Sequence, residues 1–271
     1  MPRPLTRRGI LAGMTAPAAG VLPTPFMNAT PLQGQPPPAT PPDKGRTRPR
    51  VVAFDVIETL FDTAPLDPVL GGLGLPRGSL KTWFTGFLRD AFALESMHDF
   101  KPFKVVASES LNALLASQGL QDKRAEIHKV LEAFTSLPAH PDVKEAFGML
   151  QKADVTILTL TNGGAASTEA MLEAAGLRGF VARVISIEEV NRWKPSREVY
   201  LHAATSMGVA PSEMALVAAH DWDVGGAAKA GLTAAGVVRE GKAFSAAFTQ
   251  PHITGKSLVE VVQALLALPA S

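Results

Sequence analysis

Hydrophobic residues in the folded part of the chain follow two alternating rhythms. Short, mostly apolar runs are typical of strands buried on both faces, and they occur at 51–54, 155–160, 181–187, 214–219 and 234–238. Helical spacing of apolar residues marks the segments between and after them, at 143–150, 165–175, 196–207, 224–230 and 258–268. Strands that alternate with helices build right-handed βαβ units. We therefore predict an α/β fold, with a Rossmann-like parallel sheet as its core and helices on both faces.

The pattern is helical only between the first strand and residue 137. Apolar residues recur there at helical spacing in three sets, around 80–88, 105–115 and 127–134. We predict an all-helical cap at 67–135, inserted into a core made of 50–66 and 136–271. The alternative is that these helices belong to the main body.

The first 49 residues show neither rhythm. Arg7 and Arg8 precede a weakly apolar stretch rich in Gly and Ala, and small residues near position 29 offer a cleavage point. Residues 1–29 thus resemble a bacterial twin-arginine signal and predict a periplasmic or secreted protein. The alternative is a disordered basic N-terminus. Residues 30–49 contain seven prolines and are predicted to be an extended linker.

Composition narrows the range of functions. The chain has 271 residues and a formal net charge of +1, which gives no reason to expect a nucleic acid or an anionic membrane as partner. It has no cysteine, so disulfides, thiolate catalysis and cysteine-ligated zinc are excluded. No apolar stretch of about 20 residues follows the N-terminal region, so no membrane contact is predicted after signal removal.

Polar residues suited to chemistry follow four of the predicted strands. They are Asp55 and Thr59 after the first, Thr161 and Asn162 after the second, Lys194 after the third, and His220 and Asp223 after the fourth. The C-terminal ends of parallel strands share one edge, so we expect these groups to converge on one crevice. Asp55 is then a candidate nucleophile or metal ligand. Alternatively, Asp55 only caps the turn that follows it.

The same positions resemble the haloacid dehalogenase superfamily, and within it the type II 2-haloacid dehalogenases. Four motifs match in order, at 55–61, 161–163, 194–200 and 222–231, and the resemblance spans 51–268. It implies that Asp55 attacks the halogen-bearing carbon of a short 2-haloalkanoic acid, forming an ester that water then hydrolyses. The implied partner is a small-molecule acid, and no cofactor or metal is needed. Family members are often homodimers.

The resemblance also gives roles to the residues around Asp55. Lys194 would keep Asp55 ionised, because a nearby cation favours the charged form, and Thr59 would hydrogen-bond it. Asp223 would position or activate the hydrolytic water.

Further residues are assigned to substrate binding. Thr161 and the N–H groups of the following helix would receive the substrate carboxylate. Asn162 would help to hold the leaving halide, and Tyr200 matches a position of the same motif as Lys194.

Three positions depart from the group's pattern. Phe84 stands where the group has its halide-binding arginine and predicts an apolar halide pocket, unless Arg89 on the same helix takes over. Glu58 replaces a glycine, so its side chain must leave the crevice or narrow it. His220 replaces an asparagine and is a candidate base for the hydrolytic water; the alternative is a structural imidazole.

Two positions bear on an alternative, a magnesium-dependent phosphatase. Ile57 stands where the superfamily's phosphatases have their general acid, and Ala219 where they have a metal ligand. A halide needs no proton donor to depart, whereas an alkoxide does, so we favour the dehalogenase. Asp221 and Asp223 would be the metal ligands of the phosphatase. A third alternative is a catalytically silent exported binding protein, which Phe84 and Glu58 would favour.

Overall fold

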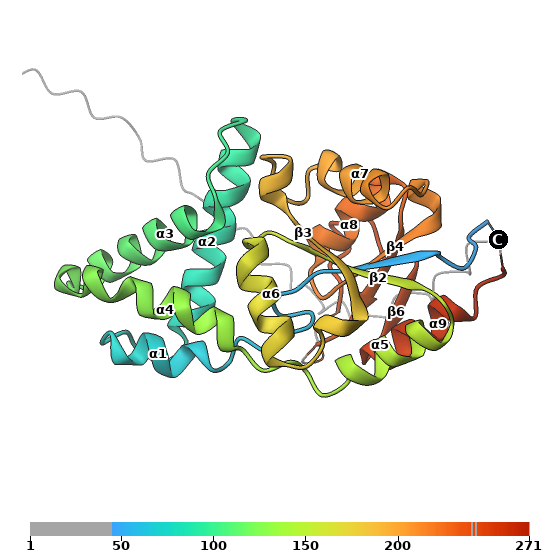
Figure 1. Ribbon diagram of the computed structural model, residues 1–271. Coiled ribbons are helices and arrows are strands. Elements are labelled where there is room, and N and C mark those ends of the chain that lie inside the picture. The colour runs from blue at the N-terminus through green and yellow to red at the C-terminus, as the bar shows by residue number, and fades with distance from the viewer. Residues whose placement is uncertain (1–44, 240, 242, 271) are drawn as a thin grey trace, which may run out of the picture. The chain divides into compact units, whose positions relative to one another are not determined.

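The computed structural model describes residues 45–239, 241 and 243–270 (Figure 1). The predicted export signal and most of the predicted linker lie outside the described residues. The chain already meets the core at Arg46, whose guanidinium donates a hydrogen bond to the carbonyl of Leu232 at 3.0 Å. This contact precedes residue 50, where we expected the core to begin.

Six parallel strands form one sheet in the order β3-β2-β1-β4-β5-β6. Their bounds are β1 Val51–Phe54, β2 Thr156–Thr161, β3 Val181–Ser186, β4 Met214–Ala218, β5 Thr233–Val237 and β6 Ile253–Gly255. Strand β1 is central, and all four of its residues are buried, as expected for a strand covered on both faces. The predicted α/β fold with a parallel sheet is confirmed.

Helices cover both faces of this sheet. Their bounds are α5 Val143–Lys152, α6 Ala165–Ala174, α7 Arg197–Ser206, α8 Asp221–Ala230 and α9 Leu258–Leu266. Helices α5 and α9 pack against one face, and α7 and α8 pack against the other (Figure 1). Short 3-10 helices occur at Gln121–Glu126, Phe134–Ser136, Arg178–Phe180, Ile187–Glu189 and Pro211–Glu213.

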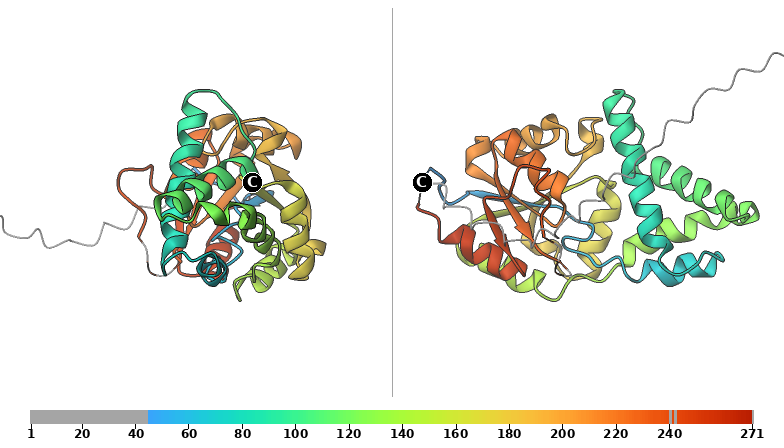
Figure 2. Two further views of the ribbon diagram at one scale, coloured as in Figure 1. Left: turned by 90° about the vertical axis from the view of Figure 1, so that its left-hand side faces the viewer. Right: turned by 180° about the vertical axis from the view of Figure 1, so that it is seen from behind.

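Four more α-helices lie between β1 and α5 in the chain. They are α1 Leu66–Gly72, α2 Ser79–Ser96, α3 Phe103–Ser117 and α4 Ile127–Ala133. Figure 1 and the view from behind in Figure 2 show them gathered beyond one end of the sheet, away from α9. We call these four helices the cap helices.

The loop after β3 joins the cap helices to the sheet. Glu95, at the end of α2, accepts hydrogen bonds from Arg192 Nε at 2.6 Å and from the N–H of Trp193 at 2.8 Å. The Trp193 ring is fully buried and lies edge-on to Phe87 of α2, with 5.6 Å between ring centroids. The residue that follows Trp193 is Lys194, so the segment that contacts the cap also carries a candidate site residue.

The last strand was not predicted. The last apolar run that predicts a strand is 234–238, whereas β6 follows at Ile253–Gly255 and pairs with β5. With three residues, of which only Gly255 is buried, β6 is too short for a run of apolar residues to reveal it.

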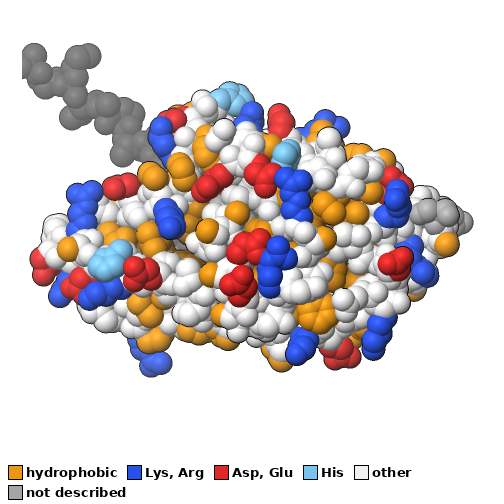
Figure 3. All heavy atoms as spheres, viewed as in Figure 1, with side chains coloured by type: hydrophobic (Ala, Val, Ile, Leu, Met, Phe, Trp, Pro, Cys, Tyr) orange, Lys and Arg blue, Asp and Glu red, His pale blue; other side chains and the backbone are white. Residues whose placement is uncertain are grey.

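The molecular surface carries charges of both signs. On the face drawn in Figure 3, acidic and basic side chains are interspersed, in keeping with the near-neutral composition. Among the described residues, no helix combines the length and the apolar character needed to cross a bilayer.

Candidate active site

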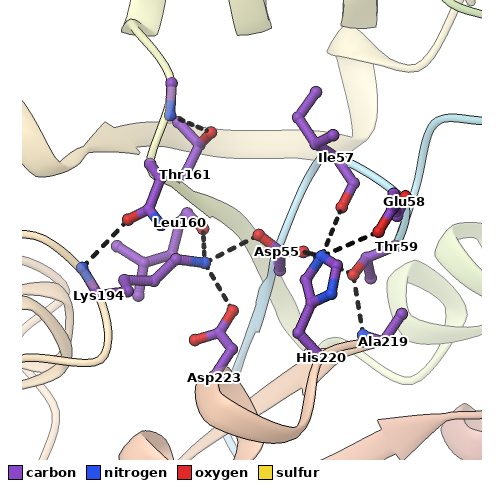
Figure 4. A network of polar contacts seen from close by, with 12 residues as sticks. Asp55, Ile57, Glu58, Thr59, Leu160, Thr161, Lys194, Ala219, His220 and Asp223 are labelled. Carbon is purple, nitrogen blue, oxygen red and sulfur yellow. Dashed lines mark hydrogen bonds and ion pairs between the residues drawn. The ribbon is translucent and has the colours of Figure 1, made fainter. Parts of the chain in front are cut away.

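Asp55 lies directly after β1, at the edge of the sheet that faces the cap helices. Its N–H donates to the carbonyl of Val217 at 3.0 Å, which continues the ladder to β4 and fixes its backbone. Its Oδ2 accepts from Thr59 Oγ1 at 2.6 Å, and that hydroxyl accepts from the N–H of Ala219 at 2.9 Å (Figure 4). The carboxylate is therefore held in one orientation.

The ammonium of Lys194 joins Asp55 to a second carboxylate. Its Nζ donates to Asp55 Oδ1 at 2.8 Å, to Asp223 Oδ2 at 2.6 Å and to the carbonyl of Leu160 at 2.9 Å. Lys194 is fully buried, and these three bonds use every donor that an ammonium has. The N–H of Lys194 also donates to Asn162 Oδ1 at 3.1 Å, which ties the loop after β3 to β2.

This arrangement sets the charge of the nucleophile candidate. Burial raises the pKa of Asp55, but the charges of Lys194 and then His220, with the hydrogen bonds that Asp55 accepts, hold it below its usual value. Burial lowers the pKa of Lys194, but the charges of Asp223 and Asp55 beside it have the larger combined effect, so this pKa lies above its usual value. Asp55 is therefore ionised and Lys194 charged across the neutral range.

Asp223 sits on the other side of the lysine. Burial, with the negative charge of Asp55, raises the pKa of Asp223 although Lys194 acts against this. Its Oδ1 accepts from the Tyr200 hydroxyl at 2.7 Å. Burial and the charge of Asp223 raise the pKa of Tyr200 well above its usual value, so the phenol is a permanent donor.

His220 faces Asp55 from the N-terminal end of α8. Its Nε2 lies 3.8 Å from Asp55 Oδ2 and 3.3 Å from the carbonyl of Ile57. Its ring is stacked on Trp222, with centroids 5.1 Å apart and planes 11° apart, and the ring of Phe84 lies 6.4 Å away. The imidazole is thus packed against aromatic rings with its Nε2 near the carboxylate.

A small cavity of about 20 Å³ lies between Asp55 and the cap helices. Most of its wall is apolar or aromatic, and its polar part comes from the strand ends: its lining is Asp55, Ile57, Phe84, Phe87, Leu88, Phe103, Thr161, Asn162, Gly163, His220 and Trp222. This volume is close to the minimum that one water molecule needs. An ionised carboxylate thus faces a small, largely apolar space.

Comparison with known proteins places this site in a family. A protein-family model for hydrolases of the haloacid dehalogenase-like type matches residues 49–231. The chain belongs to this family. The match includes Asp55, Lys194 and Asp223 together with the cap helices.

Individual relatives within the haloacid dehalogenase-like family are similar over most of the chain. (S)-2-haloacid dehalogenase 1 of Pseudomonas sp. (strain CBS-3) is 30% identical, with 81% of this chain and 97% of that protein covered. (S)-2-haloacid dehalogenase 4A of Burkholderia cepacia is 29% identical, with coverage of 71% and 84%. The structure of L-2-haloacid dehalogenase from Xanthobacter autotrophicus with chloropropionic acid covalently bound superposes with a TM-score of 0.75 at 22% identity, covering 81% of this chain and 99% of that one. This last likeness concerns the fold.

Most of the expected site residues meet at one place in this family member. Asp55, Thr59 and Lys194 form one hydrogen-bonded group. The residues expected to contact substrate, apart from Tyr200, line the cavity, and they are Phe84, Thr161 and Asn162. His220 also lines it.

One expected contact with substrate needs correction, and a second residue lies deeper than expected. Tyr200 is not among the residues that line the cavity; its fully buried hydroxyl binds Asp223 instead. Asp223 is itself fully buried, and both its oxygens are taken by Lys194 and Tyr200. Asp223 and Tyr200 therefore lie on the far side of Lys194 from Asp55 and do not line the cavity; the role of Asp223 toward the hydrolytic water stays a prediction.

Arg89 does not take the place of the group's halide-binding arginine, whose position is occupied here by Phe84. It lies further along α2, pairs with Asp90, and its side chain is 75% exposed. Five residues of an α-helix make about 1.4 turns, a net offset of about 140°, so positions 84 and 89 of α2 point to different sides. At position 84 the wall of the cavity is therefore aromatic.

The ligand set of a metal site is not assembled here. Both oxygens of Asp223 accept hydrogen bonds, from Lys194 and Tyr200. Asp221 Oδ2 accepts from the N–H of Ser245 at 3.3 Å. Ala219 offers only backbone atoms, and its N–H is bound to Thr59. Within residues 45–239, 241 and 243–270, no group of three or more His, Asp or Glu side chains is placed to hold a metal ion.

Glu58 is a site residue whose direction the sequence left open. It adopts a left-handed backbone with φ of 63°, which is rare for residues other than glycine. Thr63 Oγ1 donates to its Oε1 at 3.3 Å, and its Oε2 lies 3.7 Å from His220 Nε2. The usual glycine at this position signals the unusual backbone, but only the structure shows where the carboxylate points.

Proposed function

We propose that this protein hydrolyses the carbon–halogen bond of a short (S)-2-haloalkanoic acid. The observation that carries the proposal is the buried, ionised carboxylate of Asp55, held by Lys194 and Thr59 and directed at a small aromatic cavity. The similarity to proteins named (S)-2-haloacid dehalogenase supports it. No cofactor takes part in the chemistry proposed.

In the first step, Asp55 displaces the halide. One carboxylate oxygen attacks carbon 2 of the acid from the side opposite the halogen, a C–O bond forms, and the carbon–halogen bond breaks with its electron pair leaving as halide. Lys194 and Thr59 hold the carboxylate at the required angle, and the apolar wall strips water from it, which strengthens it as a nucleophile. No proton is transferred in this step.

In the second step, water attacks the side-chain carbonyl carbon of Asp55. His220 is the group placed to take a proton from that water, because its Nε2 lies 3.8 Å from Asp55 Oδ2. The tetrahedral intermediate collapses, the bond between the Asp55 carbon and the ester oxygen breaks, and the 2-hydroxy acid leaves. Because carbon 2 is attacked once, its configuration is inverted.

The polar and apolar walls of the cavity would bind different parts of the substrate. Thr161 and the backbone after it, which begins α6, face the acid's carboxylate. Asn162 has its oxygen bound to Lys194, so its amide N–H groups are the part left to bind the halide. Phe84 provides an apolar surface for the same halide.

The test is halide release from (S)-2-chloropropionate, with Asp55→Asn as the decisive variant. We expect release by the wild type to be unaffected by a chelator, and loss on the order of 10³-fold or more in the variant, because an amide is a poor nucleophile. Asp154→Asn, at an exposed position outside the site, is the matched control and should keep full activity.

A single turnover in ¹⁸O-water identifies the attacked bond. With enzyme in excess, the label should appear in the Asp55 carboxyl group and not in the hydroxy acid. Label in the product would mean that water attacks the substrate directly and would overturn the proposal. Phosphate release from p-nitrophenyl phosphate with added Mg²⁺, in place of halide release, would support a phosphatase.

We also infer that residues 1–29 export the protein through a twin-arginine route. The paired Arg7 and Arg8 ahead of a weakly apolar stretch support this. Expression of the full chain in a bacterium, followed by cell fractionation, should find it in the periplasm. Arg7→Lys combined with Arg8→Lys should retain it inside; unchanged export would contradict the inference.

A further inference from the structure

A second cavity adjoins the catalytic one and has a different character. Its volume is about 110 Å³, and its lining is mostly ionisable or polar: Glu58, Asp62, Thr63, His140, Ala219, His220 and Arg239. We call it the polar chamber. It has room for several water molecules, whereas the cavity at Asp55 has room for about one.

Two orphaned atoms indicate that water belongs in the polar chamber. His140 Nε2 and Arg239 Nε are buried and have no hydrogen-bond partner among the described residues. The other nitrogens of Arg239 are taken by Asp142, at 2.8 and 3.0 Å, and by the carbonyl of Thr59, at 2.9 Å. Buried polar atoms are normally satisfied by protein or by ordered water, so water is the partner that remains.

His220 lines both the polar chamber and the cavity at Asp55. Its Nε2 lies 3.7 Å from Glu58 Oε2 and 3.8 Å from Asp55 Oδ2, so one ring nitrogen faces a carboxylate on each side. Figure 4 shows the imidazole between the two acids. The imidazole is therefore the partition between the two spaces.

The proposed reaction needs such a connection. Each turnover consumes one water and releases one halide, one hydroxy acid and one proton. Once the ester has formed, the alkyl part contributed by the substrate fills a cavity that has little space to spare, so the attacking water must arrive from elsewhere. The charge on Asp55 also disappears in the ester, and Glu58 becomes the one carboxylate that still faces His220 Nε2.

Resting on the proposed function, we propose that the polar chamber supplies the hydrolytic water and removes the proton, with Glu58 as the acceptor paired with His220. In the ester state, Glu58 takes the proton from Nε2. The free Nε2 then takes a proton from the attacking water while the water oxygen bonds to the Asp55 carbonyl carbon. The imidazolium returns this proton to the departing alkoxide oxygen. Glu58 then returns its proton to Nε2, which restores the starting imidazolium, and the proton of the restored Asp55 carboxyl group leaves through the chamber as the one proton released per turnover.

The test separates the two half-reactions in Glu58→Gln. We expect the first halide, about one per active site, to be released as fast as in the wild type, because Glu58 takes no part in the displacement. Steady-state turnover should fall by about 10²-fold, a typical loss for a missing proton acceptor. The ester should then accumulate, visible in the quenched protein as the mass of one propionate adduct.

Controls keep the result interpretable. Glu109→Gln makes the same change at a cap side chain that is 63% exposed and should behave as wild type. Glu58→Gly suits the left-handed backbone and removes the carboxylate, so it should accumulate ester even if the Gln variant folds poorly. Glu58→Asp should restore part of the turnover.

Equal slowing of the halide burst and of steady-state turnover, without adduct, would show that Glu58 only shapes the site and would overturn the inference. A wild type that releases no halide and forms no adduct with any 2-haloacid would instead refute the proposed function.

Discussion

Lys194 determines the charge state of two acids at once. Its ammonium is shared between Asp55 and Asp223, and both lie where water does not screen them. The two acids are not equivalent, because Asp55 also accepts from Thr59 and faces His220, whereas Asp223 accepts from Tyr200. Lys194 lowers the pKa of both acids, but the further contacts of Asp55 leave its pKa below the usual value, whereas burial and the charge of Asp55 leave that of Asp223 above it.

Replacing Lys194 by Met should move the acidic limb of activity. The folded-state pKa of Asp55 is depressed, so the active anion persists until the pH falls through that low value. Without the cation, burial remains as the opposing cause and raises the pKa, so the acidic limb of kcat/KM should shift to higher pH. The pH profile of halide release measures this, with Lys229→Met, on an exposed position of α8, as control.

The same substitution should also lower stability. Removing one partner of a buried ionic group typically costs about 3–5 kcal/mol, and here it leaves two carboxylates facing each other. Denaturant unfolding at neutral pH gives the value. An unshifted pH profile together with unchanged stability would contradict the role assigned to Lys194.

Sequence alone found the residues that meet at Asp55 because they share one sheet edge. Asp55, Thr161 and Lys194 follow parallel strands, and topology brings such ends together. The sequence could not show which of these side chains line the cavity and which lie deeper in the protein. That Asp223 and Tyr200 lie behind the lysine depends on side-chain direction, which neither spacing nor motif records. The direction of Glu58 likewise depends on its backbone angle.

Among the elements, helices α7 and α8 approach closely at a glycine. A Cβ atom on Gly226 would lie 2.7 Å from the Tyr200 hydroxyl and 2.7 Å from Pro195 Cβ. The glycine therefore lets the hydroxyl of α7 reach Asp223 at the start of α8. Residues of both helices thus position the carboxylate of Asp223, which accepts a hydrogen bond from Lys194.

Gly226→Ala should damage this contact, and Gly225→Ala is its matched control. Overpacking of this kind typically costs about 1–3 kcal/mol, and displacement of Tyr200 should also slow halide release. A Cβ on Gly225 would meet Phe248 at an acceptable 3.4 Å, and Ala favours helix, so that variant should be neutral or more stable. Thermal unfolding of both variants tests the pair; equal effects would contradict the explanation.

Elements were predictable where their patterns were long. The apolar runs of β1 and β4 and the helical spacing of α2 predicted them because burial leaves a periodic trace. The three residues of β6 leave none. Its place in the sheet comes from pairing with β5, a contact that sequence rhythm does not encode.

At the scale of the whole described molecule, one acid on the cap determines how the cap helices meet the sheet. Glu95 accepts from Arg192 and from the N–H of Trp193, so α2 is fastened to the loop that carries Lys194. Aromatic packing of Phe87 on Trp193 reinforces the contact. The loop that carries Lys194 is therefore also the loop that holds α2 of the cap against the sheet.

Glu95→Ala should weaken closure. Hydrogen bonds to charged groups contribute about 1.5–3 kcal/mol, enough to raise KM for a 2-haloacid by about tenfold or more. The halide burst at saturating substrate should remain, because the groups around Asp55 are untouched. Glu132→Ala, at an exposed position of α4, is the control. An unchanged KM would show that Glu95 has no part in closure.

The size of the cavity at Asp55 has a kinetic consequence. A space of about 20 Å³ is close to what one water molecule needs, so we expect a haloacid to enter, and its product to leave, through excursions of the side chains or cap helices around the cavity. When such excursions are slow, they limit the turnover number. The kcat for a brominated acid would then be no higher than that for a chlorinated one, although the carbon–bromine bond is weaker. Both kcat values would fall as solvent viscosity rises.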